Sequence, residues 1–371
     1  MKRIMLLIFL CFSSFYSFAQ DNTNSQDTSQ VVNFNAKITW IKDLKNQLTS
    51  LISASDNKLF AISKDGKIFC YDFSGRIIWE HDLKRSIAGK PIDSDGNLVI
   101  STLSGDLISL NDSTGESIQS IGLNEPLTSP LVKISTMYNG NSTEAVILGS
   151  SKGSIYCYDI NSFEMIWENH SAKGAVMSKP LALGNKIIFT SRDGYLYCLD
   201  SRSGMLIWKW TDPKINNIDL ANCSPISDNR DVFICSTNKA IYSIDPMLGR
   251  TRWKKDFYNC NQPIVISENR KYLYIKSTKN NFNLVSPIDG RSFRKLDMDF
   301  GEDSSLSAPI EWKGSVLLGT GNGKVYLIEN NLKWKPLFYL KGGAIQTIAH
   351  LEDDTFVVSN DSGRLIEFKL E

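Results

Sequence analysis

The sequence carries almost no net charge and very few histidines. Its 41 Lys and Arg residues balance 40 Asp and Glu residues, which leaves a formal net charge of +1. A basic excess is the usual feature of nucleic-acid-binding chains, so we expect no nucleic-acid partner. The three histidines, His81, His170 and His350, lack the spacing of a metal site. We therefore expect no histidine-based metal or catalytic centre.

Common motifs of catalysis and cofactor binding are also missing. The chain has no Gly-x-Ser-x-Gly nucleophile motif, no His-Glu-x-x-His zinc motif and no phosphate-binding loop. The glycine-rich segment 319–324 is predicted to be a turn between strands, because no helical pattern follows it. The sequence thus predicts no catalytic residue, no cofactor and no metal.

Long hydrophobic runs are missing except at the N-terminus. Residues 1–19 have the layout of a secretory signal peptide, with a basic start, an apolar stretch over 4–12 and a small-x-small site ending at Ala19. The apolar stretch is too short to span a membrane comfortably. Leu10 precedes Cys11 where a lipoprotein signal requires a small residue. We expect cleavage after Ala19 and export, with no transmembrane segment and no lipid at Cys11.

Residues 20–35 are polar and poor in aromatic side chains, which predicts a flexible leader. The remainder, residues 36–371, is predicted to form one domain. We expect an exported monomer that is periplasmic, associated with the outer membrane, or secreted.

The mature chain contains an internal repeat. A turn residue, usually glycine, recurs at intervals of 39 to 48 residues, at Gly66, Gly105, Gly153, Gly194, Lys239, Asn280, Gly323 and Gly363. In the fourth unit, short runs rich in β-branched and aromatic residues cover 177–183, 185–191, 195–200 and 205–210. Four short strands in about 40 residues are typical of a propeller blade. The eight units predict an all-β, eight-bladed β-propeller of four-stranded blades.

The two ends of the chain are predicted to close this ring. The last unit reaches Glu371 after its third strand and lacks an outer strand. The segment 36–43 around Trp40 has the sequence of an outer strand with no unit before it. We expect these residues to complete the C-terminal blade, which leaves no unpaired sheet edge at the closure.

Tryptophan recurs at one outer-strand position, usually four residues after a second glycine. The positions are Trp40, Trp79, Trp167, Trp208 and Trp253, whereas Gln119 and Arg294 stand there in two other units. A tryptophan can bury its face between neighbouring blades while its N–H finds a partner, which contributes ~2–3 kcal/mol. We predict structural, blade-docking tryptophans rather than a ring that stacks on a ligand.

An acidic residue recurs six residues after the first turn position, as Asp72, Asp159, Asp200 and Asp245. Equivalent positions in a propeller are spread around its circumference, so these carboxylates are not expected to converge on a metal. An Asp at the start of a turn accepts hydrogen bonds from nearby backbone N–H groups. We predict that they cap turns.

The repeated pattern [A/C]-x-D-x-x-[T/S]-G-x-x-x-W, seen in CLDSRSGMLIW over 198–208, resembles the tryptophan-docking motif of pyrroloquinoline-quinone-type (PQQ-like) β-propellers. The non-enzymatic branch of that superfamily includes the BamB-like outer-membrane assembly proteins. The resemblance implies a protein–protein interaction scaffold in the cell envelope, with outer-membrane assembly machinery as partner. The alternative it implies is a quinone-dependent dehydrogenase, but those enzymes carry adjacent cysteines, which this chain lacks.

The cysteines are predicted to be structural. Cys70, Cys157 and Cys198 share one position inside apolar strands and are expected to be small buried residues. Cys223 and Cys235 lie symmetrically about a turn near Asn229, so they form either a cross-strand disulfide or two thiols. Cys260 is an alternative partner for either of them.

Functional residues usually lie on loops, and two connections between blades are long. These are 211–223, with Asp212, Lys214 and Asp219, and 296–308, with Asp299, Phe300 and Glu302. We predict that both contribute to a partner-binding surface, with tolerated insertions as the alternative. A long hairpin over 135–145 is expected on the opposite face. Exposed Tyr258 or Phe300 would instead suit a secreted propeller that binds glycans or peptides.

Overall fold

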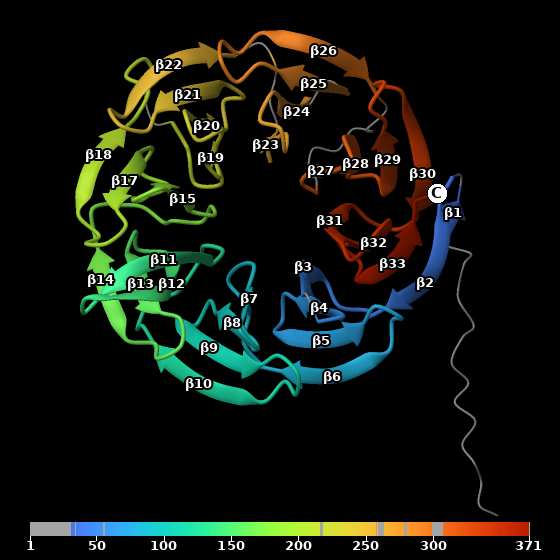
Figure 1. The fold of residues 1–371 in the computed structure, drawn as a ribbon, viewed down its shortest axis with the longest axis horizontal. Helices are drawn as coiled ribbons and strands as arrows, with labels where there is room; N and C mark the ends of the chain where they lie inside the picture. Colours follow the sequence, from blue (N-terminus) through green and yellow to red (C-terminus); the bar gives the residue numbers. More distant parts are fainter. Residues whose placement is uncertain are drawn as a thin grey trace, which may run out of the picture.

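The computed structural model describes residues 31–33, 35–54, 56–215, 218–256, 258, 263–277, 280–298 and 307–370. Within these ranges the regular structure consists of β-strands, which form eight sheets arranged in a ring (Figure 1). The short inner strands surround the axis and the outer strands form the rim. The prediction of an all-β, eight-bladed propeller is confirmed.

Each blade is an antiparallel sheet of four consecutive strands, with a modified order at the closure. Blade 1 contains β3 (Leu48–Ala54), β4 (Lys58–Ser63), β5 (Lys67–Asp72) and β6 (Ile77–Asp82). Blade 2 contains β7 (Ile92–Ser94), β8 (Asn97–Ser101), β9 (Asp106–Asn111) and β10 (Ser117–Gly122). Blade 3 contains β11 (Val132–Tyr138), β12 (Asn141–Gly149), β13 (Ile155–Asp159) and β14 (Met165–Asn169). Blade 4 contains β15 (Leu181–Leu183), β16 (Lys186–Thr190), β17 (Leu196–Asp200) and β18 (Leu206–Trp210).

The second half of the ring repeats this plan. Blade 5 contains β19 (Ile226–Ser227), β20 (Val232–Cys235), β21 (Ile241–Asp245) and β22 (Arg250–Lys255). Blade 6 contains β23 (Val265–Ile266), β24 (Leu273–Ser277), β25 (Asn281–Val285) and β26 (Ser292–Asp297). Blade 7 contains β27 (Ile310–Trp312), β28 (Ser315–Gly319), β29 (Lys324–Ile328) and β30 (Trp334–Leu340). Blade 8 contains β31 (Ile345–His350), β32 (Thr355–Asn360) and β33 (Arg364–Lys369).

The N-terminal segment closes the ring as predicted. β2 (Lys37–Asp43) pairs with β33 and supplies the outer strand of blade 8. The structure adds one strand that the sequence did not predict. β1 (Val31–Asn33) pairs with β30 as a fifth strand of blade 7. The expected flexible leader, residues 20–35, is therefore wrong for residues 31–33, because the edge of β30 offers backbone partners that a strand can use.

The two faces of the ring carry different turns. The connection face carries the segments that link consecutive blades and the turns between second and third strands. The hairpin face carries the other turns, including the long β11–β12 hairpin. At the repeated turn position on the connection face, Gly66 has a φ of +99°, and a Cβ there would lie 2.2 Å from the Arg85 carbonyl oxygen. This close approach explains the recurrent glycine.

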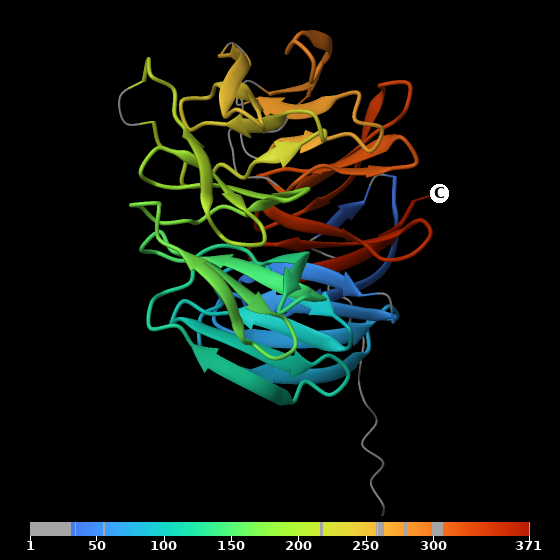
Figure 2. The same ribbon diagram turned by 60° about the vertical axis from the view of Figure 1, so that its left-hand side comes forward.

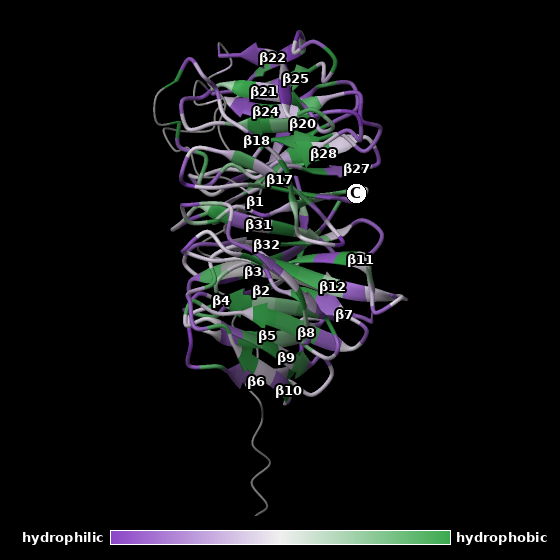
Figure 3. Cartoon of the chain, turned by 90° about the vertical axis from the view of Figure 1, so that its left-hand side faces the viewer, coloured by the Kyte–Doolittle hydropathy of each residue, from purple (hydrophilic) through white to green (hydrophobic). Residues whose placement is uncertain are grey.

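The hydrophobic core is divided into clusters that lie between neighbouring blades. The second and third strands of each blade are buried on both faces, as in β16 and β17. One cluster, for example, joins Ile147 and Cys157 of blade 3 to Phe189 and Tyr197 of blade 4. Seen edge-on, the strands between the two faces of the ring are mostly apolar, and the loops at both faces are mostly polar (Figure 3). Successive blades stack around the ring with their strands tilted (Figure 2).

Candidate interaction surface

The five recurrent tryptophans, here called the inter-blade tryptophans, lie between neighbouring blades. Each indole N–H donates to a backbone carbonyl of the next blade's hairpin-face turn. The pairs are Trp40 to Phe73 (3.3 Å), Trp79 to Asp112 (2.9 Å), Trp167 to Ser201 (3.0 Å), Trp208 to Pro246 (3.0 Å) and Trp253 to Pro287 (3.0 Å). They belong to the outer strands β2, β6, β14, β18 and β22 of five different blades (Figure 1), so they offer no common surface for a ligand.

The ring of each inter-blade tryptophan also packs on a glycine of the same turn. At Gly204, which has a φ of +68°, a Cβ would lie 2.5 Å from Cε3 of Trp167. Only a residue without a side chain permits this approach in the left-handed region. The Trp–Gly pair therefore requires both residues.

Two of the remaining junctions are closed by other means. Between blades 2 and 3, Gln119 replaces the tryptophan and its Nε2 donates to the Asn161 carbonyl at 2.6 Å. Between blades 7 and 8, the N-terminal segment crosses from β1 to β2. Asn35 donates from its backbone N–H to Leu337 and from Nδ2 to Pro336.

The repeated aspartates lie in turns of the hairpin face. Asp200 Oδ1 accepts the backbone N–H groups of Arg202 and Ser203 at 3.0 and 2.9 Å. Burial raises the pKa of Asp200, but the N–H and hydroxyl groups of Ser203 and the N–H of Arg202 together outweigh burial and hold this pKa below its usual value. In the described part of the chain, no three His, Cys, Asp or Glu side chains group as metal ligands do.

The described parts of the loop 211–223 on the connection face, residues 211–215 and 218–223, are anchored rather than fully exposed. Asp212, predicted to contact a partner, is 6% exposed and accepts hydrogen bonds from Tyr242 Oη (2.9 Å), Lys254 Nζ (3.0 Å) and the Lys214 N–H (2.9 Å). The placement of Asp212 on a contact surface is therefore wrong, since these donors draw the carboxylate inward. Burial raises the pKa of Asp212, but the three donors outweigh it and lower the pKa.

Lys214 and Asp219 remain exposed on this loop. The Asp219 carbonyl accepts the hydroxyl of Thr237 at 2.9 Å, and Leu220 is fully buried in the core between blades 4 and 5. The described parts of the loop therefore hold the positive charge of Lys214 and the negative charge of Asp219 at exposed positions beside buried residues. Asp299, Phe300 and Glu302 of the second loop lie outside the described residues, so their role stays a prediction.

The Cys223–Cys235 disulfide is not formed. β19 pairs with β20 in the register Ile226 to Phe233, which places the two cysteines one residue out of alignment. Since neighbouring residues face opposite sides of a sheet, Cys223 packs in the core between blades 4 and 5 and Cys235 in the core between blades 5 and 6. Cys260 and Cys11 lie outside the described residues.

Other predicted residues are buried or have local partners. The pKa of Cys70, Cys157 and Cys198 is raised to about 12, mainly by burial. Tyr258 is 5% exposed and its hydroxyl donates to the Gly290 carbonyl at 3.0 Å, so it is not an exposed glycan-contacting ring.

The described residues contain no helix long and apolar enough to cross a membrane.

Sequence reasoning missed one cavity, which lies between blades 6 and 7. Arg294 stands at the tryptophan position there, and this substitution was visible in the repeat. The absence of the tryptophan could therefore be seen in the sequence, but the cavity could be found only in the structure.

A ring of eight antiparallel blades, five of whose junctions carry a Trp–Gly pair, is the architecture of a PQQ-like β-propeller. The family model described as outer membrane protein assembly factor BamB matches residues 27–296 of the chain. The chain therefore belongs to this family.

Individual relatives are distant. The outer membrane protein assembly factor BamB of Yersinia pestis is 23% identical over 292 residues, which cover 76% of this chain and 62% of the relative. The chain thus matches less than two thirds of that relative's length. The crystal structure of BamB from Moraxella catarrhalis is similar with a TM-score of 0.70, 18% identity, and coverage of 90% of this chain and 100% of that chain.

A redox enzyme shares the same fold. The quinohemoprotein alcohol dehydrogenase ADHIIG of Pseudomonas putida HK5 matches with a TM-score of 0.69 and 11% identity, over 91% of this chain and 77% of that chain. At this identity the similarity establishes the fold alone.

Proposed function

We propose that the protein is a non-enzymatic scaffold of the cell envelope that binds outer-membrane assembly machinery. The observation that carries this proposal is the family match over residues 27–296. The signal-peptide pattern of residues 1–19 supports export. The absence of adjacent cysteines in the sequence favours a scaffold over a quinone-dependent dehydrogenase.

The connection face is the proposed contact surface, and the loop 211–223 between blades 4 and 5 is the proposed point of contact. Asp212 fixes the loop through Tyr242 and Lys254. Segments that are anchored in this way lose little conformational entropy when a partner binds. Lys214 and Asp219 are the exposed charges that would contact this partner, and Asp212 holds the backbone of Lys214.

The test is crosslinked affinity purification of the full-length protein from its native envelope, followed by mass spectrometry. We expect outer-membrane assembly components to be recovered. Their absence, or quinone absorbance in the purified protein, would contradict the proposal.

A charge swap tests the loop itself. The double variant Lys214→Glu/Asp219→Lys preserves net charge and is expected to reduce recovery of these components severalfold. The matched control is Arg202→Glu/Glu116→Lys, which swaps one exposed charge of each sign on the hairpin face. Equal recovery by the two double variants would exclude this loop from the contact.

A further inference from the structure

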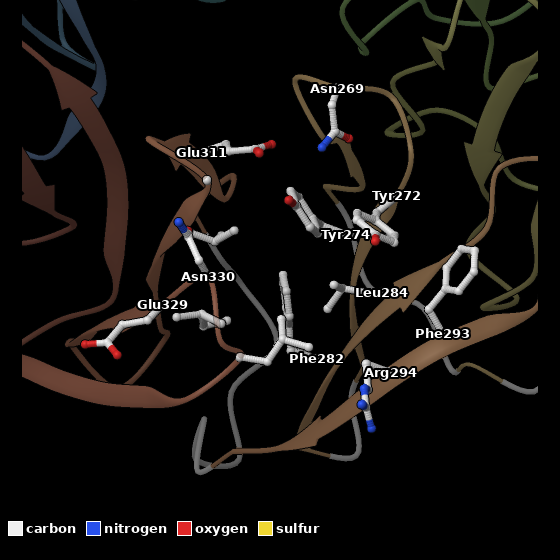
Figure 4. A pocket seen from close by; sticks show the side chains of 14 residues that line it. Asn269, Tyr272, Tyr274, Phe282, Leu284, Phe293, Arg294, Glu311, Glu329 and Asn330 are labelled. Atoms are coloured by element: carbon white, nitrogen blue, oxygen red, sulfur yellow. The ribbon is translucent and has the colours of Figure 1, made fainter.

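The cavity between blades 6 and 7 opens at the hairpin face and has a volume of about 360 Å³. This volume lies in the range of sites for small organic groups. Tyr272, Tyr274, Leu284 and Phe293 of blade 6 line it (Figure 4). Blade 7 contributes the polar residues Glu311, Glu329 and Asn330 and the apolar residues Val316, Ile328 and Leu332 to the opposite wall.

The cavity exists where the Trp–Gly pair is replaced on both sides. Arg294 pairs with Leu284 in the sheet, as Trp253 pairs with Ser243 one blade earlier. Leu332 adopts a φ of +64° in the turn of blade 7, at the place of the glycine. Arg294 is exposed and extends away from Tyr274 and Glu311. The indole that would close the junction is therefore missing from the chain itself.

The surface that contacts an indole elsewhere is nevertheless present. Phe60 and Phe233 occupy the strand position of Tyr274 in their own blades, and their ring centroids lie 5.8 Å from those of Trp79 and Trp253. Tyr274 is 5% exposed and its ring stacks against Phe282 with centroids 5.6 Å apart. An indole placed in the cavity would meet the same kind of aromatic wall.

The hydrogen-bond acceptor has a counterpart as well. Pro246 and Pro287, whose carbonyls accept indole N–H groups, each follow the recurrent turn-entry position of their blade by one residue. Asn330 holds this position in blade 7 and lines the cavity.

The polar wall of the cavity favours a donor over an anion. Glu311 and Asn330 line it, and the Glu311 carboxylate is directed toward Tyr274, whereas the Glu329 carboxylate points away from Tyr274 (Figure 4) and pairs with Lys335 at 3.3 Å. Burial and the nearby Glu311 carboxylate both raise the pKa of Tyr274. A wall that carries the Glu311 carboxylate beside stacked aromatic rings is complementary to a flat ring that carries an N–H donor.

We propose that this cavity binds a tryptophan side chain of a partner protein, which takes the place of the indole that the chain supplies at other junctions. The cavity lies on the hairpin face, away from the loop 211–223. The proposal therefore goes beyond the scaffold function and does not rest on it.

The probe is the N-acetyl amide of 5-fluorotryptophan, titrated with the full-length protein and followed by ¹⁹F NMR. We expect saturable line broadening that N-acetyl-tryptophanamide reverses and N-acetyl-leucinamide does not. Absence of saturable binding would overturn the proposal. Binding of indole with rejection of both tryptophan amides would also overturn it, and would indicate a small-molecule ligand instead.

Variants locate the site. Arg294→Trp/Leu332→Gly rebuilds the missing pair, so it should fill the cavity, weaken probe binding at least tenfold and raise the unfolding temperature. The matched control, Gln119→Trp/Phe163→Gly, installs the same pair between blades 2 and 3 and should leave probe binding unchanged.

Phe293→Ala changes an exposed ring, 57% accessible, and should weaken binding severalfold without unfolding the chain. Unchanged binding by both cavity variants would place the probe elsewhere.

Discussion

The junction between blades 3 and 4 is closed by Trp167, whereas the junction between blades 6 and 7 holds a cavity at the equivalent place. Trp167 is 7% exposed and donates its N–H to Ser201 at 3.0 Å. Arg294 occupies the same strand position in blade 6 but is exposed. The central strands β24 and β25 are still fully buried. A blade therefore forms without its tryptophan, and the indole serves to close the space between blades.

The largest expected effect comes from opening the closed junction. Trp167→Ala removes a buried indole and its hydrogen bond, and should lower the free energy of unfolding by ~3–5 kcal/mol. Urea denaturation followed by circular dichroism measures the change. The control is Trp334→Ala in blade 7, because that ring is 38% exposed, and its loss should cost less than ~1 kcal/mol. Equal costs would show that the junction contributes no special stability.

A smaller effect is expected from the glycine on which Trp167 packs. Gly204→Ala should cost ~2–4 kcal/mol, because it adds a contact with the indole to the strain of a left-handed backbone. Gly184→Ala is the control, since Gly184 has a φ of +56° and nothing within 4 Å of an added Cβ. It should cost only ~1 kcal/mol. The difference between the two unfolding free energies measures the Trp–Gly contact, and no difference would argue against it.

The smallest effect concerns the turn that presents Ser201 and Gly204 to Trp167. The pKa of Asp200 is lower in the folded chain than in the unfolded chain, since the donors of Ser203 and Arg202 outweigh burial. The stability from this group is therefore present above the unfolded pKa, ~4, and is lost as the pH falls through the folded pKa. Asp200→Asn should flatten the decrease in unfolding midpoint below pH ~5 relative to the wild type. An identical pH profile would exclude this contribution.

Most of the fold could be predicted because the same pattern of strands and turns recurs in eight units. Positions such as Gly66 and Gly194 share a turn geometry in which a side chain would meet the backbone of the following connection. The pairing of residues 36–43 with the last blade followed from an outer strand missing at one end and present at the other. Both are local patterns that remain visible in a linear chain.

The loop residues could not be assigned in the same way. Asp212 and Asp219 are both acidic and lie on one loop, yet Asp212 is buried against Tyr242 and Lys254 while Asp219 is exposed. The two partners of Asp212 come from strands 30 and 42 residues away, so no local pattern separates Asp212 from Asp219. Whether Cys223 and Cys235 could form a disulfide depended in turn on the register of β19 with β20. This register differs by one residue from that of a hairpin symmetric about Asn229.

The sequence by itself determined the number of blades, the turns within them and the residues that dock one blade on the next. These depend on short-range geometry that recurs in every unit. The tertiary structure decided how each junction is filled, because that depends on side chains from two blades at once. Arg294 was visible as an exception in the repeat, but the cavity beside it exists because Tyr274, Leu284 and Leu332 leave the place of the indole open.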